Sequence, residues 1–480
     1  MASSVQIRLR AGLSSCLRSF QVRPPVWRGR WAQNASQWAN NTNNCGYSTA
    51  SSLTKVEKLV LDTIKGSATS SATGPMSFST YMKMCLAHPT EGYYSNPSNP
   101  IFGAKGDFIT SPEISQVFGE LLAVWMLSQW LNSGNAKPIR LVELGPGRGT
   151  LMADILRVLA QFPAARAAVS DILLVENSDT LKTTQAETLR PLAEKNEWNL
   201  SWTSHIEEVE ATDKQYTMVV AHEFFDALPF HLLQATDGWR EVLITSGPDP
   251  TSPTKLGAST HPLDNPSPGT VKNLSSTNFR TVLSPTSTAT ANLLGVSSPR
   301  FQKIPVGGRL EVSPTSFKIA RRIGELLHSD STGTGAAGCA LIIDYGGAKS
   351  YGSSFRAFKG HKIVDVFHRP GECDLTINVD FAYLKDAIAD LAMTLGPLPQ
   401  GMFLTRMGLR LRVEALKKVA KSEKRKTDIE NAAKRLVDAT GMGSQYQVLA
   451  ISGTGKAELS PEQRWPFVDQ QQLQNTNVRN

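Results

Sequence analysis

The chain has 480 residues and a formal net charge of +8, from 50 basic and 42 acidic residues. Seven of the basic residues lie in the first 56, before the first acid, Glu57, so the remainder is close to neutral. Because the positive charge is concentrated in this segment, the net charge gives no reason to expect a nucleic-acid-binding surface on the rest of the chain. No run of about 18 uncharged apolar residues is present, so no transmembrane segment is predicted.

The N-terminus has the features of a mitochondrial transit peptide. Residues 1–50 are rich in Arg and Ser, contain no acid and can form an amphipathic helix over VQIRLRAGLSSCLRSF. No apolar segment of about 7–15 residues could serve as a secretory signal. We predict a disordered presequence over 1–50 and a mature protein in the mitochondrial matrix; the alternative is a disordered basic tail. Five scattered cysteines form neither a disulfide framework nor a CxxC metal pair, which suits a reducing compartment.

The sequence pattern over residues 57–136 predicts an N-terminal region that is mainly helical. VEKLVLDTI has the helical spacing of apolar residues, and FGELLAVWMLSQWL (118–131) predicts an amphipathic core helix. Between them, GAKGDFITSPEISQVFG mixes Gly and Pro with residues that begin helices. Thr110 or Ser111 can cap a helix that has Pro112 in its first turn.

Residues 137–245 alternate short apolar runs with helical segments. The predicted strands are IRLVEL, DILLVEN, LSWT, YTMVVA and REVLIT, and the predicted helices are LMADILRVLAQF, DTLKTTQAETLRPLAEK and FFDALPFHLLQ. Strands that alternate with helices pair in parallel. The predicted fold class is therefore α/β, with a doubly wound, mostly parallel sheet.

The second half of the chain changes composition twice. Residues 246–308 are rich in Ser, Thr and Pro and poor in large apolar residues, which predicts a flexible insertion or a lid. Over 309–460 we expect the remainder of the core and C-terminal elements, with a helix capped by Ser313 and strands at CALIIDYGG and YQVLAISG. The tail over 461–480 is expected to be disordered.

A glycine-rich loop, Gly145-Pro-Gly147-Arg-Gly149, follows the strand IRLVEL. Glycines at such a turn let the backbone approach a ligand and expose the N–H groups of the next helix. The dinucleotide fingerprint G-x-G-x-x-G needs glycine where Thr150 stands, which disfavours an NAD-dependent dehydrogenase. The spacing E-x-G-x-G-x-G, which begins at Glu143, is similar to the first motif of Rossmann-like S-adenosylmethionine methyltransferases.

An acid at the end of the next strand supports this interpretation. Glu176 lies 27 residues after Gly149, where a carboxylate can accept hydrogen bonds from both ribose hydroxyls of an adenosine. Glu143 would then support the loop or bind the methionine end of the donor. The alternative is a tight turn with two solvated acids. We favour a site for S-adenosyl-L-methionine as co-substrate.

The segment VVAHEFFDALPFH (219–231) predicts an acceptor site. Ligands of such sheets bind beyond the carboxyl ends of the strands, which places His222, Glu223 and Asp226 beside the transferable methyl group. At the start of a helix, two carboxylates three residues apart lie on the same side. Together they can bind a guanidinium by hydrogen bonds, while the ring of Phe224 or Phe225 packs on its face. For Glu223, the alternative to acceptor binding is that it caps the N-terminus of the predicted helix. His222 either relays a proton or is only hydrogen-bonded.

The sequence resembles the MidA-like methyltransferases over about residues 57–455. This family includes a mitochondrial protein arginine methyltransferase that acts as a complex I assembly factor. The resemblance depends on motifs in matching order: GPMSFSTYM, HPTEGYY, GDFITSPEISQVFGE, VELGPGRGTLM, AHEFFDALPFH, GRLEVSP, ALIIDYG and PGECDLTINVDF.

The resemblance implies a Rossmann-like core with an N-terminal helical region and with inserted and C-terminal elements on the substrate side. It implies symmetric dimethylation of an arginine in the quinone-site core subunit on the matrix arm of complex I, early in assembly. It also implies that GDFITSPE (106–113) folds over the donor, so that Asp107, Thr110, Ser111 and Glu113 are donor-site candidates.

Other functions remain open at this point. One is a methyltransferase for a different acceptor, and another is a non-catalytic complex I assembly chaperone that uses the donor pocket only structurally. Because the residues at both ends of the predicted donor pocket are intact, we disfavour the chaperone. Asp344 and Asp374 are weaker candidates for the site, with buried capping roles as the alternative.

Overall fold

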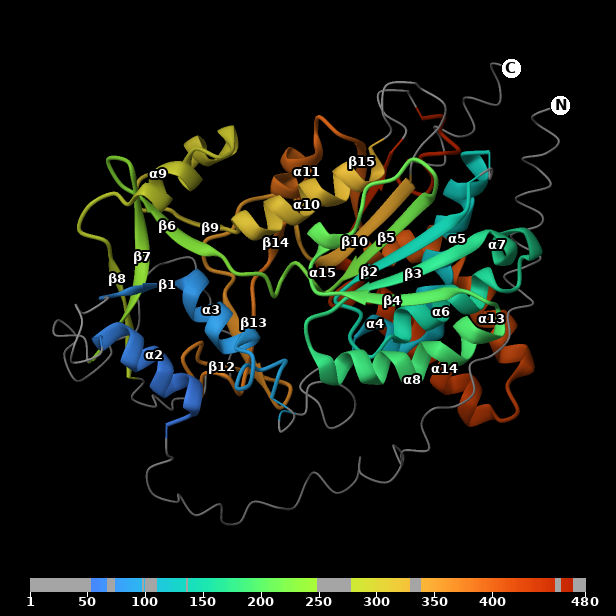
Figure 1. Ribbon diagram of the computed structural model, residues 1–480, viewed down its shortest axis with the longest axis horizontal. Coiled ribbons are helices and arrows are strands. Elements are labelled where there is room, and N and C mark those ends of the chain that lie inside the picture. Colours follow the sequence, from blue (N-terminus) through green and yellow to red (C-terminus); the bar gives the residue numbers. More distant parts are fainter. Residues whose placement is uncertain are drawn as a thin grey trace, which may run out of the picture.

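A large, mostly parallel sheet lies beside a smaller antiparallel one (Figure 1). The structure is a computed structural model and describes residues 53–66, 74–96, 99, 110–134, 137–247, 278–328, 338–453 and 459–468. The presequence predicted over 1–50 lies outside these residues. In the part that is described, no helix is both long enough and apolar enough to cross a membrane.

The large sheet has the strand order β15-β16-β10-β5-β2-β3-β4, and β14 pairs with β10. The strands from β4 to β10 pair in parallel, while β16 is antiparallel to both of its neighbours. The bounds are β2 Ile139–Leu144, β3 Val169–Val175, β4 Asn199–Thr203, β5 Tyr216–His222, β10 Gly338–Gly347, β14 Val379–Asp380, β15 Met393–Pro399 and β16 Tyr446–Ser452. This confirms the predicted α/β class and the Rossmann-like core.

The central strands are recognisable in the sequence because both faces of the sheet are covered. Every residue of β2 and β5 is buried, and both strands are mostly apolar, although β2 includes the charged residues Arg140 and Glu143. One face packs against α5, α6, α8, α13 and α14, and the other against α10 and α11. The bounds are α5 Gln116–Asn132, α6 Thr150–Leu159, α8 Asp179–Lys195, α10 Pro314–Leu327, α11 Phe381–Ile388, α13 Leu409–Val419 and α14 Glu423–Val437.

Helix α5 is buried on nearly all sides, so the predicted amphipathic pattern is wrong. Its acid, Glu120, is fully buried and accepts hydrogen bonds from Arg412 Nε at 2.7 Å and from Arg157 Nη1 at 2.8 Å. A buried carboxylate needs such partners. The ion pair with Arg412 connects α13 to α5 in the core.

The smaller sheet has the order β1-β7-β6-β9, with β8 paired to β7, and all of its pairs are antiparallel. Its bounds are β1 Met76–Ser77, β6 His231–Ala235, β7 Trp239–Ser246, β8 Phe279–Leu283 and β9 Arg309–Val312. REVLIT is therefore part of this second sheet rather than of the core. The turn between β6 and β7 holds Asp237-Gly238, a dipeptide that favours hairpins.

The helix predicted over FFDALPFHLLQ (224–234) is wrong. After β5 the chain turns, with Glu223 in the left-handed region (φ 49°), and then forms β6. The turn is held from a distant strand: Asp344 Oδ2, on β10, accepts hydrogen bonds from the backbone N–H groups of Phe225 (3.0 Å) and Asp226 (3.3 Å). These contacts replace the helical hydrogen bonds that the local pattern suggested.

The flexible insertion expected over 246–308 is ordered in its second part. From 278 the chain forms β8, α9 (Ala289–Gly295) and the short 3-10 helix η2 (Pro299–Lys303). Phe279, Leu294 and Phe301 are buried, and these apolar side chains anchor the segment. Residues 248–277 lie outside the described part.

The N-terminal region divides between the two sheets. Helices α2 (Lys55–Lys65) and α3 (Phe78–Ala87) pack with the smaller sheet, whereas α4 (Ser111–Ile114) and α5 pack with the core. The predicted disordered tail is also ordered at its start, because Trp125 Nε1 on α5 donates to the carbonyl of Trp465 at 3.2 Å. The remaining short helices are α7 Pro163–Ala168, η1 Ile206–Glu208, α12 Gln400–Arg406 and α15 Met442–Gln445.

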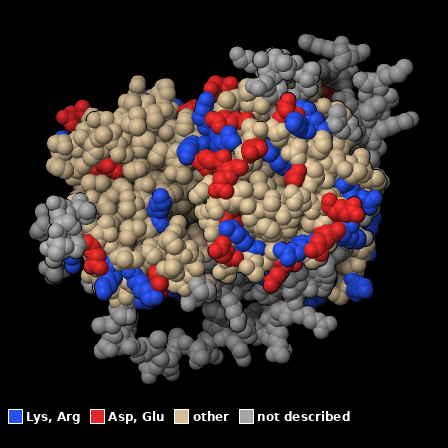
Figure 2. Space-filling model, viewed as in Figure 1, with Lys and Arg blue, Asp and Glu red and all other residues tan. Residues whose placement is uncertain are grey.

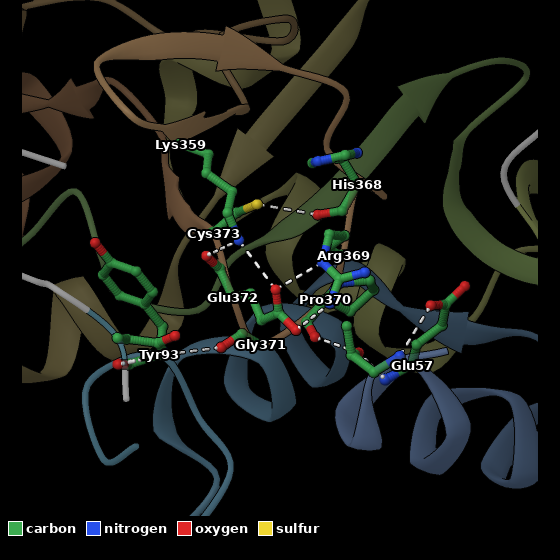
Figure 3. A network of polar contacts seen from close by, with 11 residues as sticks. Glu57, Tyr93, Lys359, His368, Arg369, Pro370, Gly371, Glu372 and Cys373 are labelled. Atoms are coloured by element: carbon green, nitrogen blue, oxygen red, sulfur yellow. Dashed lines mark hydrogen bonds and ion pairs between the residues drawn. The ribbon is translucent and has the colours of Figure 1, made fainter. Parts of the chain in front are cut away.

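A third sheet, β12-β11-β13, carries the motif PGECDLTI (370–377). Its strands are β11 Arg356–Lys359, β12 Lys362–Val364 and β13 Asp374–Thr376. Figure 3 shows Glu372 between Arg369 and Lys359, with hydrogen bonds to both. Thr54 Oγ1, just before α2, donates to the carbonyl of Pro370 at 2.6 Å. The motif therefore fixes the N-terminal helix against β13, from which Thr376 reaches the site described next.

Charges of both signs are interspersed over the half of the molecule that contains the core sheet (Figure 2). Over α9, β6 and β7 few charged side chains are visible on this face, whereas charges of both signs gather in the lower part of the same half. No extended surface of one sign is visible here, as expected for a chain whose residues after 56 are close to neutral.

Candidate active site

The glycine loop crosses the carboxyl ends of β2 and β3. Gly145, Gly147 and Gly149 have φ of 62°, 53° and 78°, a conformation that glycine adopts without strain. The N–H of Gly145 donates to the carbonyl of Val175 at 3.1 Å, and Gly149 leads into α6. A Cβ on Gly145 would lie 2.8 Å from Cδ2 of Phe224. The loop is therefore in contact with the segment that follows β5.

Glu143, the residue before Leu144 at the end of β2, is a buried carboxyl with an unused oxygen. The residue is 2% exposed, and its Oε2 has no hydrogen-bond partner among the described residues. Burial raises the pKa of Glu143 to about 8, and a hydrogen bond from the backbone of Met152 opposes this shift only in part. A buried polar atom without a partner is costly, which points to a ligand group at this position.

Glu176 follows β3 and is held on both oxygens. Its Oε1 accepts from the backbone N–H of Ser178 at 2.8 Å, and its Oε2 accepts from Gln185 Nε2 at 3.0 Å. Burial raises its pKa, and these hydrogen bonds act in the opposite direction. Gln185 also donates to the carbonyl of Gly147 at 2.8 Å, so one side chain connects this acid to the glycine loop.

A second group of acids lies beyond the carboxyl ends of β5 and β10. Asp226 Oδ2 accepts hydrogen bonds from the hydroxyls of Tyr345 and Thr376, the latter at 2.7 Å, whereas Oδ1 has no partner among the described residues. Glu223 Oε1 accepts from the hydroxyl of Tyr446 at 2.8 Å. These two carboxylates are brought together by the turn after β5, without the helix on which we expected them to share a side.

The two carboxylates share their environment with further ionisable groups. Burial and the negative charge of Asp226 raise the pKa of Glu223 to about 8. Burial also raises the pKa of Asp226, whereas the hydroxyls of Tyr345 and Thr376 and then the guanidinium of Arg356 lower it. That guanidinium lies over the ring of Tyr345, 5.0 Å from its centroid. An added cation would relieve the repulsion between the two acids.

His222 is buried between the rings of Phe118 and Tyr446. Its Nε2 lies 3.6 Å from Glu223 Oε1 and has no hydrogen-bond partner in the described chain. Burial lowers the pKa of His222 to about 3. The imidazole is therefore neutral near pH 7 and a weak proton acceptor.

The candidates from 106–113 are placed only in part. Asp107 lies outside the described residues. Thr110 occupies the N-cap position of α4, although its side chain makes no capping hydrogen bond, and Pro112 is in the first turn as expected. The hydroxyl of Ser111 donates to Gln400 Oε1 at 3.4 Å, and the charge of Glu113 contributes to the raised pKa of Glu223.

Comparison with known proteins identifies the class of enzyme. The family model described as a putative S-adenosyl-L-methionine-dependent methyltransferase matches residues 121–398. The protein arginine methyltransferase NDUFAF7, mitochondrial, from Danio rerio is 36% identical over 402 residues, which cover 80% of this chain and 85% of the relative. The protein of the same name from Homo sapiens is 32% identical, with 93% and 92% covered.

The chain belongs to this methyltransferase family. The resemblance found in the motifs is thereby confirmed, and the co-substrate of this methyltransferase is S-adenosyl-L-methionine. A COG1565 superfamily member from Burkholderia thailandensis, crystallised with S-adenosyl-homocysteine, superposes with a TM-score of 0.60 at 23% identity, over 83% of this chain and 93% of the other. This likeness supports the fold.

The residues of this methyltransferase fit such a co-substrate. The glycine loop leaves open backbone beside α6, and Glu143 offers an unpaired oxygen next to it. Sequence reasoning missed the partners of the acids. Gln185 donates to Glu176 and in turn accepts from Trp202. The hydroxyls of Tyr345 and Thr376 donate to Asp226, and that of Tyr446 donates to Glu223. In the described residues, no group of three or more His, Cys, Asp or Glu side chains could hold a metal ion.

Proposed function

We propose that this chain is a protein arginine methyltransferase of the mitochondrial matrix. Its substrate would be an arginine in the quinone-site core subunit of complex I, dimethylated symmetrically during assembly. The observation that carries the proposal is a pair of carboxylates, the buried Asp226 and the half-buried Glu223, next to Phe224, which itself contacts the glycine loop. The names of the relatives, which specify arginine and the mitochondrion, support it.

On the donor side, Glu143 would face the methionine end of the donor and Glu176 would face its ribose. The three glycines have no Cβ, so the backbone of the loop can come into close contact with the donor. S-adenosylmethionine, when bound, supplies a methyl group on a positively charged sulfur. The side chains of 110–113 would cover this pocket as the resemblance implies. The chain's contribution here is orientation, which in methyl transfer accounts for much of the acceleration.

On the acceptor side, Glu223 and Asp226 would hold a guanidinium through charge-assisted hydrogen bonds. The free Asp226 Oδ1 and the raised pKa of both acids suit this role, because a cation restores their ionised form. As a guanidinium nitrogen forms its bond to the methyl carbon, the carbon–sulfur bond breaks and that nitrogen becomes more acidic. Glu223 or Asp226 then accepts the proton; His222, with a pKa of about 3, is too weak a base to be needed.

Product analysis tests the proposal. The chain without residues 1–50 is incubated with methyl-labelled S-adenosylmethionine and the quinone-site subunit, and the protein is hydrolysed in acid. We expect label in symmetric dimethylarginine. Donor binding without any labelled arginine would contradict the proposed acceptor and direct attention to another substrate or to a role as a chaperone.

Donor binding is expected to release a proton from Glu143. In the free protein the pKa of Glu143 is about 8, so the carboxyl is mostly protonated at pH 7. The ammonium group of a bound amino-acid moiety favours the carboxylate and lowers that pKa. Affinity for S-adenosylhomocysteine should therefore rise with pH, by up to about tenfold per unit between roughly pH 6 and 8.

Titration calorimetry in two buffers of different ionisation enthalpy counts the protons released. Glu143→Gln should abolish the release at pH 7. Glu223→Gln is the matched control, because its pKa is also raised to about 8 and it lies on the acceptor side. The assignment of Glu143 to the methionine end is wrong if the release disappears in Glu223→Gln and persists in Glu143→Gln.

A further inference from the structure

Gln185, on α8, is a fully buried polar side chain at the junction of the two halves of the donor site. Its Nε2 lies 2.8 Å from the carbonyl oxygen of Gly147 and 3.0 Å from Glu176 Oε2. Its Oε1 lies 2.9 Å from the indole nitrogen of Trp202, on β4. The amide therefore contacts the glycine loop, the acid after β3 and the neighbouring strand at once.

The orientation of this amide is determined by chemistry. An indole N–H can only donate, so the atom of Gln185 that faces Trp202 must be the oxygen. Both amide protons are then directed to acceptors, one to Gly147 and one to Glu176. A flipped amide would place N–H against N–H at Trp202 and oxygen against oxygen at the other two contacts.

This arrangement fixes Glu176 in one plane. Gln185 holds Oε2, and the backbone N–H of Ser178 holds Oε1 at 2.8 Å. Each carboxylate oxygen can still accept a further hydrogen bond. The acid is thus oriented before any ligand arrives, and the carbonyl of Gly147 is held by the same side chain.

We propose that Gln185 is a positioning residue for the donor's ribose, acting through Glu176, with Trp202 fixing the amide. The inference depends on the proposed contact between Glu176 and the ribose. At metal sites, removing a partner that orients a ligating side chain typically costs about 10- to 100-fold in affinity, and we expect a loss of the same order here. A side chain that is already oriented loses less entropy when the ligand binds. Removing this orientation should therefore raise the dissociation constant.

The test compares two ligands by titration calorimetry: S-adenosylhomocysteine, and its analogue that lacks both ribose hydroxyls. Gln185→Met keeps the length of the side chain and removes all three hydrogen bonds. We expect it to lower the affinity for S-adenosylhomocysteine by about 10- to 100-fold and to change the affinity for the dideoxy analogue by less than about threefold. Trp202→Phe replaces the indole by a smaller ring and removes its N–H, while Gln185 keeps its contacts with Glu176 and Gly147, and it should weaken the binding of S-adenosylhomocysteine by a smaller factor.

Two further variants make the outcomes distinct. Gln161→Met, at a partly buried glutamine whose Nε2 donates to the carbonyl of Arg157, should change neither affinity. An equal loss for both ligands in Gln185→Met would mean general damage to the pocket and would overturn the inference while leaving the donor site in place. If Glu176→Gln leaves the affinity for S-adenosylhomocysteine unchanged, the ribose assignment itself fails, and the inference fails with it.

Discussion

Asp226→Asn is expected to slow methyl transfer by about 10²–10⁴-fold while donor affinity stays the same. The amide keeps the size of the side chain and can still accept from Thr376 and Tyr345. It cannot carry negative charge toward a guanidinium or accept its proton. Single-turnover rates with saturating, pre-bound S-adenosylmethionine measure the chemical step, and calorimetry with S-adenosylhomocysteine measures the donor site.

Asp390→Asn is a suitable control, because this carboxylate is exposed and pairs with Arg321 on the surface. Surface pairs of this type contribute little, so the control should retain the rate of the unmodified chain. Asp226 would have no part in acceptor binding or proton transfer if the rate in Asp226→Asn stayed within threefold of that of Asp390→Asn.

Gly145→Ala is expected to reduce donor affinity about 100-fold or more. Two unfavourable terms add up to about 2–5 kcal/mol. One is the backbone strain of an alanine in the left-handed region, and the other is the clash of its Cβ with the ring of Phe224, 2.8 Å away. The structure can avoid the clash only by moving the glycine loop or the segment after β5. Calorimetry with S-adenosylhomocysteine measures the loss.

The chain offers a control that separates the two costs. Gly307 also has positive φ, at 87°, but a Cβ there would meet no atom within 4 Å. Gly307→Ala carries the backbone strain without the clash and should leave donor affinity unchanged. Adding Phe224→Ala to Gly145→Ala should restore part of the affinity. Equal donor affinities in Gly145→Ala and Gly307→Ala would show that contact with Phe224 is irrelevant to donor binding.

The sequence allowed the core strands to be predicted because their signals are local. IRLVEL and YTMVVA are buried on both faces, and a strand of this kind is recognisable as a short, mostly apolar run. The acids and glycines of the proposed donor site follow the ends of core strands or lie close to them. Their place at one edge of the sheet is a consequence of parallel pairing.

The group of residues proposed as the acceptor site depends on contacts between distant parts of the chain. The segment after β5 has apolar residues at a helical spacing, yet Asp344, more than a hundred residues away, holds it as a turn. Tyr345, Thr376 and Tyr446 reach the carboxylates from three different strands, and no local spacing relates them. Asp237-Gly238 was the one local sign of a hairpin, and it would have corrected the helix prediction for β6.

The raised pKa values of Glu143 and Glu223 have a consequence for the lifetime of the empty enzyme. Between about pH 4.5, where these side chains ionise in an unfolded chain, and about pH 8, the folded chain retains protons that the unfolded chain has released. The free energy of unfolding therefore falls as pH rises through this window. Ligands that bring positive charge to these carboxyls offset that loss. With the donor at Glu143 and the acceptor at Glu223, as proposed, we expect the form without substrates to be the one most exposed to unfolding and proteolysis in alkaline surroundings.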